Sequence, residues 1–157
     1  MNASTLWLII SLIVALLLTA LPLPYPMYFF MPDWVGLVLI FGVLYCPNIV
    51  RFLVIFIIGV CCDLLMGAPL GLHPFAYLCG LFPAIRWRNE FLDQSDLIQP
   101  FLVFGMLMTA RIAMLGAWLV VSQSTVSLLF FLPPVIAALL WLIVDRILFN
   151  HIQTEMY

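Results

Sequence analysis

Two side chains of opposite charge, Asp63 and Arg111, lie inside apolar stretches of this sequence and are its first candidates for chemistry. A charged group at membrane depth costs about 2.5–3.5 kcal/mol, so it usually faces protein or water and has a function. The sequence leaves three roles open for Asp63: an ion pair with Arg111, recognition of a partner or substrate, or capping of a turn through backbone N–H groups near Gly67. As a catalytic set, one acid and one arginine are weak.

A glycine-rich apolar segment surrounds Asp63 and spans residues 59–71, with the sequence GVCCDLLMGAPLG. Gly59, Asp63 and Gly67 are four residues apart, so on a helix they share one face, with small residues above and below the carboxylate. In lipid, helices associate through close packing and polar contacts, which makes such a face suited to docking. The residues expected here to bind a partner or to hold the structure are Gly59, Asp63, Gly67, Leu70 and Gly71.

Other chemistry-bearing residues show no catalytic or metal-binding pattern. The sequence has no nucleophile elbow, no phosphate-binding glycine loop and no His or Cys pair at ligand spacing. His73 and His151 are expected to be polar interface residues, and four cysteines to be packing residues: Cys46, Cys61, Cys62 and Cys79. We therefore predict a protein that is not an enzyme and uses neither a cofactor nor a metal.

The composition determines which elements hold these residues. Of 157 residues, 67% are hydrophobic and only 8% are charged, against about 25% charged in soluble domains. The mean hydropathy is +1.27. These values predict an integral membrane protein, and five arginines without a lysine or a basic stripe exclude nucleic-acid binding. The N-terminal apolar run has no basic residue before it, so we expect a retained span rather than a signal peptide.

A bilayer core of about 30 Å requires about 20 helical residues, and six apolar runs fit approximately. They predict an all-α, single-domain polytopic membrane protein with spans near residues 3–21, 33–46, 49–66, 70–85, 97–121 and 126–149. The second run is short for a full crossing. Asp33 is expected to cap its N-terminus, and Trp34 to anchor at the membrane interface.

Two connections in the second half are less regular. The polar residues 86–96 predict a solvated loop. In the last run, Pro133 and Pro134 leave two interpretations open: either the helix kinks there, or it begins there and residues 127–132 form an interfacial lead-in.

The arginines predict the orientation in the membrane. If the N-terminus is cytoplasmic, Arg51, Arg86, Arg88 and Arg146 all lie at the cytoplasmic side and none at the outer side, as the positive-inside rule expects. Both termini are then cytoplasmic, and the turn at residues 67–71 lies at the outer face.

Two motifs resemble a known family. The run Met31-Pro32-Asp33-Trp34-Val35, followed by the Asp-Leu-x-x-Gly-x-x-Leu-Gly pattern that begins at Asp63, resembles rod shape-determining protein MreD. The resemblance implies a bacterial inner-membrane protein without catalytic activity. It also implies association with MreC, and through it with MreB, RodA and a class B penicillin-binding protein. The implied fold is similar to the substrate-binding subunits of energy-coupling-factor vitamin transporters.

Two functions from different classes follow. The first is a non-enzymatic membrane scaffold of the cell-elongation complex that binds MreC and helps to position peptidoglycan synthesis. The second is a small-molecule-binding membrane subunit of a vitamin-type transporter, with an outer pocket near Asp63, His73 and Trp34. Such a pocket needs several converging polar groups, and the spans offer few in sequence, which favours the scaffold.

Overall fold

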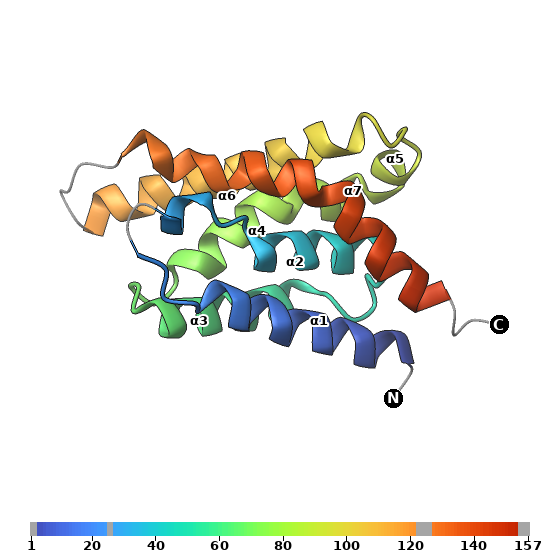
Figure 1. The fold of residues 1–157 in the computed structure, drawn as a ribbon, viewed down its shortest axis with the longest axis horizontal. Coiled ribbons are helices and arrows are strands. Elements are labelled where there is room, and N and C mark those ends of the chain that lie inside the picture. Colours follow the sequence, from blue (N-terminus) through green and yellow to red (C-terminus); the bar gives the residue numbers. More distant parts are fainter. Residues whose placement is uncertain (1–2, 25–26, 122–126, 154–157) are drawn as a thin grey trace.

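The computed structural model describes residues 3–24, 27–121 and 127–153, and within these ranges it is helical without a strand (Figure 1). The all-α prediction is therefore confirmed. The elements are α1 (Ala3–Thr19), the 3₁₀ helix η1 (Met27–Phe30), α2 (Trp34–Tyr45), α3 (Phe52–Met66), α4 (Leu72–Arg86), α5 (Arg88–Leu92), α6 (Gln99–Val121), the 3₁₀ helix η2 (Leu128–Phe131) and α7 (Leu132–Gln153).

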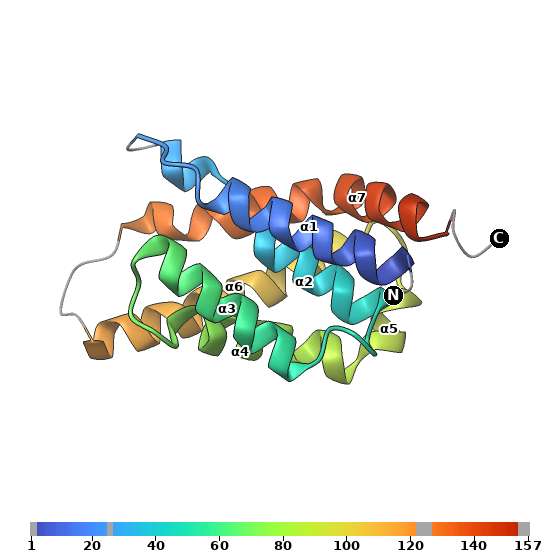
Figure 2. The same cartoon turned by 90° about the horizontal axis from the view of Figure 1, so that it is seen from below.

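The six longer helices run along one axis and reverse direction from each to the next (Figures 1 and 2). α4 packs most extensively against α6 and next against α3, while α2 contacts α1, α4 and α7. Because directions alternate, two sets of helix ends gather at opposite ends of the bundle. The ends of α1, α3 and α6 and the starts of α4 and α7 share one of them, whereas the short α2 starts nearer the middle of the bundle (Figure 1).

The short second run forms the centre of the core. Residues 35–44 of α2 are all buried, although twelve residues span only about 18 Å at the helical rise. Its two glycines allow neighbours to approach: a Cβ on Gly36 would lie 2.6 Å from Leu107 Cδ2, and one on Gly42 would lie 2.5 Å from Val50 Cγ2. The run is thus a buried helix shorter than a bilayer.

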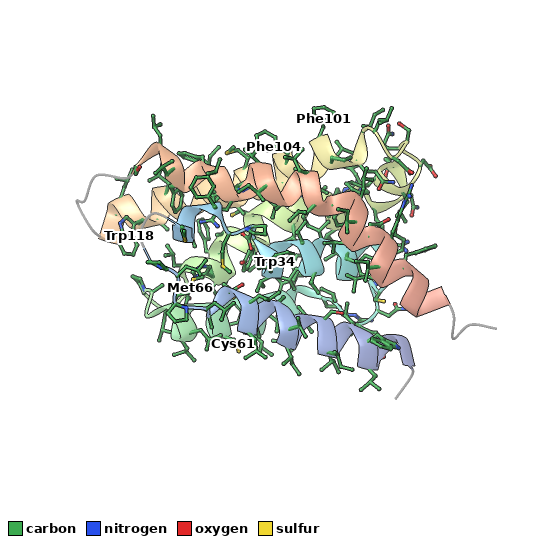
Figure 3. The ribbon with its side chains drawn as sticks, viewed as in Figure 1. Trp34, Cys61, Met66, Phe101, Phe104 and Trp118 are labelled. Atoms are coloured by element: carbon green, nitrogen blue, oxygen red, sulfur yellow. The ribbon has the colours of Figure 1, made fainter. Side chains whose placement is uncertain are left out.

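Two helices in the described part of the chain are long and apolar enough to cross a membrane, at Gln99–Val120 and Leu128–Phe149. The apolar helices α1, α2 and α3 are shorter than that, so helix length does not confirm six full spans. Large apolar side chains nonetheless cover the outside, among them Leu17, Leu53 and Leu139. Figure 3 shows Phe101 and Phe104 pointing outward from α6. Such a surface suits lipid rather than water.

The two irregular connections are now defined. The expected loop at 86–96 contains the short helix α5, whose Phe91 is buried and packs edge-on to Trp141, with ring centroids 6.1 Å apart. The prediction of a fully solvated loop is therefore wrong for Phe91. Its neighbours in sequence are polar, which hid the burial of its ring.

In the last run, α7 begins at Leu132 with Pro133 in its first turn, and η2 precedes it. The interpretation with a lead-in is the correct one.

The four cysteines are free, and Cys46 and Cys62 are buried in the apolar core. This agrees with the packing role expected from their apolar surroundings.

Candidate functional site

Asp63 is fully buried and fixes the turn between α3 and α4. Its Oδ2 accepts a hydrogen bond of 2.7 Å from Gly71 N, and its Oδ1 accepts one of 3.0 Å from His73 N. These N–H groups lie at the start of α4, where helical donors have no intrahelical partner and the helix dipole favours negative charge. The capping role for Asp63 is therefore confirmed.

The predicted Asp63–Arg111 ion pair is wrong. The side-chain partner of Asp63 is His73, whose Nδ1 lies 2.6 Å from Asp63 Oδ1. The two side chains share one short hydrogen bond between Nδ1 and Oδ1. His73 is itself only 8% exposed, so it is a buried partner of the acid rather than an interface residue. The sequence did contain a signal for this pair, since Asp63 and His73 stand on either side of a short turn bounded by two glycines.

Two glycines bring these groups together. Gly67 ends α3 with φ +63°, and Gly71 precedes α4 with φ +98°, both in the left-handed region that favours glycine. Their placement explains the Gly-x-x-Leu-Gly spacing, since a tight reversal must return the chain to Asp63. Leu70 lies between them and is 71% exposed.

Gly59 lies where α3 crosses α4. A Cβ there would be 2.5 Å from Pro74 N and 2.6 Å from Pro74 Cα, so only glycine fits against that backbone. The face expected to receive another protein at this point is therefore filled by α4 of the same chain.

Arg111 meets a different acid, Asp33. Asp33 caps α2 as predicted, accepting 2.9 Å bonds at Oδ1 from Gly36 N and from the Tyr77 hydroxyl. Its Oδ2 lies 3.7 Å from Arg111 Nη2, and the Arg111 guanidinium carbon is 5.0 Å from the centre of the Phe130 ring. Asp33 is available because α2 is short and starts beside the middle of α6.

Trp34 does not have the exposed position expected of an interfacial anchor. It is half-buried, packs against the core, and its indole Nε1 is buried without a hydrogen-bond partner in the described residues. Figure 3 places it in the middle of the bundle. The role of Trp34 as a membrane anchor stays a prediction, because its half-buried position does not locate the membrane interface.

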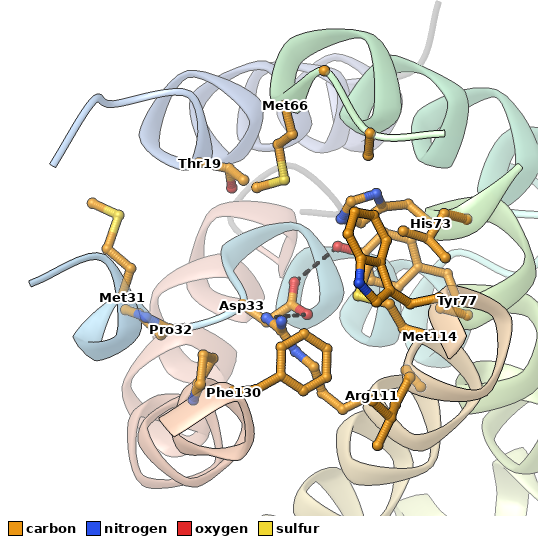
Figure 4. A pocket seen from close by; sticks show the side chains of 18 of the residues that line it. Thr19, Met31, Pro32, Asp33, Met66, His73, Tyr77, Arg111, Met114 and Phe130 are labelled. Carbon is orange, nitrogen blue, oxygen red and sulfur yellow. Dashed lines mark hydrogen bonds and ion pairs between the residues drawn. The ribbon is translucent and has the colours of Figure 1, made fainter. Parts of the chain in front are cut away.

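A cavity of about 530 Å³ opens between these helix ends, within the usual range for small-molecule sites (Figure 4). Its polar wall is formed by Thr19, Asp33, His73, Tyr77, Arg111 and Ser127, and its apolar wall includes Met31, Met66, Leu72, Met114, Leu115 and Phe130. The polar groups come from α1, α2, α4, α6 and the start of η2. The sequence scatters them, so the expectation that few polar groups converge is wrong.

The arrangement has the donors and acceptors to hold a polar ligand. In the described ranges, no three His, Cys, Asp or Glu side chains gather as a metal site. His151 is at a position whose side chain lies outside the described residues.

Comparison with known proteins identifies the family. The family model for rod shape-determining protein MreD matches residues 1–151, almost the whole chain. No solved structure matches the fold. The chain therefore belongs to the MreD family, whose members are shape-determining membrane proteins of the bacterial cell envelope and are not a known enzyme family.

Proposed function

We infer that this protein is a non-enzymatic membrane scaffold of the rod complex, which binds MreC and helps to position peptidoglycan synthesis. MreB, RodA and a class B penicillin-binding protein associate with it indirectly, through MreC. Membership of the MreD family supports the cellular role. The bonding of Asp63 supports a structural use of the acid in the most characteristic motif, since its carboxylate is occupied by Gly71 and His73.

The observation that carries the binding proposal is the outer surface of α3. Only Ile55, Gly59, Cys62 and Asp63 of this helix are buried, and α4 is the neighbour against which it packs. The remaining surface includes an apolar stripe, defined as Leu53, Ile57 and Leu64, which are 69%, 50% and 68% exposed. We propose this α3 stripe as the surface for the membrane segment of MreC, because packing drives helix association in lipid.

The orientation with both termini cytoplasmic is part of the proposal. Arg51, Arg86, Arg88 and Arg146 belong to the bundle end opposite the cavity, where α3 and α6 begin and α4 ends. Arg88 Nε donates to Leu44 O there. The positive-inside rule then places the cavity at the outer face. A reporter at Tyr157 that requires the cytoplasm should be active, and activity of a periplasmic phosphatase there would refute this orientation.

The proposed fold class is that of the substrate-binding subunits of energy-coupling-factor transporters. Six alternating helices with a cavity at one end support it. An experimentally determined structure superposed on such a subunit tests it, and a different helix order around the cavity would refute it.

The scaffold proposal is tested by co-purification of MreC from the native membrane with the tagged protein. Leu53→Trp, Ile57→Trp and Leu64→Trp enlarge the α3 stripe without touching the core. Leu139→Trp, on α7 at a residue 75% exposed, is the matched control. We expect the three α3 variants to lose most of the bound MreC and to give rounded cells, and the control to behave as wild type.

Two results would contradict the proposal in different ways. If wild-type protein does not retain MreC, the scaffold function fails. If MreC is retained equally by all four variants, the α3 stripe is not the contact surface. Unchanged thermal unfolding of each variant in detergent establishes that a loss of MreC comes from the surface.

A further inference from the structure

Two opposite charges lie beside each other in the cavity wall, the Asp33 carboxylate and the Arg111 guanidinium. Arg111 Nε is buried and has no hydrogen-bond partner among the described residues. Asp33 receives both of its hydrogen bonds at Oδ1, and the 3.7 Å between its Oδ2 and Arg111 Nη2 is too long for a third. The carboxylate and the guanidinium are thus only loosely paired with each other, so a ligand in the cavity that bonds to both gains two charge-assisted contacts.

The charges of this wall limit the class of ligand. Asp33 and Arg111 together are neutral, so a purely anionic ligand would meet the carboxylate, and a purely cationic one would meet the guanidinium. A zwitterion places an ammonium against Asp33 Oδ2 and an anionic oxygen group against Arg111, whose planar fork matches carboxylate and phosphate. Figure 4 shows the two side chains beside each other in the wall of the cavity.

The rest of the cavity is apolar and adaptable. Met66 and Met114 supply flexible thioethers, and Phe130 stacks on the Arg111 guanidinium while lining the same space. The cavity extends along α6 from Arg111 to Trp118, which is about 10 Å at the helical rise. This depth and the volume of about 530 Å³ accommodate a polar head with an apolar portion.

We propose that this cavity binds a zwitterionic group, an ammonium next to a carboxylate or phosphate, that is attached to an apolar portion. Asp33 and Arg111 recognise the two charges, and Met66, Met114 and Phe130 contact the apolar portion. A free apolar amino acid and the headgroup of an ethanolamine phospholipid share this chemistry. The site does not depend on MreC binding, so the two proposals fail or hold separately.

The test is a titration of the purified full-length protein in a neutral detergent, read by thermal unfolding and calorimetry. L-leucine is compared with 4-methylpentanoate, which lacks the ammonium, and with 3-methylbutylamine, which lacks the carboxylate. Dihexanoyl phosphatidylethanolamine is compared with dihexanoyl phosphatidylglycerol. We expect a zwitterion to bind at least about tenfold more tightly than its singly charged analogue, since one charge-assisted bond is lost.

Variants identify the site. Asp33→Asn keeps an acceptor for the α2 cap but removes the charge, and Arg111→Gln removes the guanidinium. Each should weaken zwitterion binding at least about tenfold. Arg146→Gln is the matched control, because Arg146 pairs with Asp96 at an exposed site at 3.5 Å, and its affinity should equal that of wild type. If Arg111→Gln does not fold, the Asp33→Asn comparison carries the test.

Binding of leucine alone would support the site and identify a soluble ligand, whereas binding of phosphatidylethanolamine alone would support it and identify a lipid. The proposal is overturned if wild type binds neither. It is also overturned if the singly charged analogues bind as well as the zwitterions, or if Asp33→Asn binds as tightly as Arg146→Gln.

Discussion

Replacing Asp63 by alanine should destabilise the fold strongly, because three hydrogen bonds end on this one buried carboxylate. Hydrogen bonds between membrane helices average about 0.6 kcal/mol, which sets a lower limit of roughly 2 kcal/mol for three. A buried donor left without its acceptor costs about 1–3 kcal/mol. We therefore expect Asp63→Ala to lower the free energy of unfolding by roughly 2–5 kcal/mol.

Asp63→Asn distinguishes capping from charge. The amide oxygen still accepts from one backbone N–H, but the amide nitrogen cannot accept from His73 Nδ1. We expect a loss between those of wild type and Asp63→Ala, roughly 1–2 kcal/mol. The assay is unfolding by SDS in mixed micelles, with Asp93→Ala as the control at an exposed aspartate, which should stay within about 0.5 kcal/mol of wild type.

A specific result would refute this account of Asp63. If Asp63→Ala is as stable as Asp93→Ala, the three bonds do not hold the α3–α4 turn. If the charge exchange Asp63→Arg with Arg111→Asp restores stability, the acid pairs with Arg111 after all. We expect no such rescue, because Arg111 lies beside Asp33.

Two further predictions concern packing. Gly59→Ala should lower the free energy of unfolding by about 1–3 kcal/mol, because its Cβ would lie 2.5 Å from Pro74 N and the backbone there cannot move away. Gly116→Ala is the control: a Cβ there would have nothing within 4 Å, so the variant should be as stable as wild type or more stable by up to about 1 kcal/mol. Equal stability of the two variants in SDS unfolding would contradict the α3–α4 crossing. Gln99→Leu should lower the free energy of unfolding by about 1–3 kcal/mol, because Trp141 Nε1 donates to Gln99 Oε1 at 3.2 Å and would lose its buried acceptor. If thermal unfolding of this variant in detergent is unchanged, that hydrogen bond does not stabilise the fold.

Composition and local sequence patterns were sufficient to predict the fold class and most helix ends. The small number of charged residues indicated a protein surrounded by lipid. Prolines and glycines separate the apolar runs, and these runs form helices within a few residues of the predicted bounds. Asp33 was recognised as a cap because capping is local: the carboxylate bonds to Gly36, three residues away. The MreD motif at Asp63 was also readable, since its glycines are required by a turn of a few residues.

The pairing of the charged side chains depends on how the helices pack and could not be predicted from the sequence. Asp63 and Arg111 were the two charges inside apolar runs, yet Asp63 bonds to His73 across the turn and Arg111 lies beside Asp33. Helical periodicity fixes the face on which a side chain lies, but its partner depends on how far neighbouring helices are shifted along their axes. Here the shortness of α2 sets that shift. Because α2 is short, Asp33 lies beside the middle of α6. The space left beyond the start of α2 is the cavity, which Asp33 and Arg111 both line.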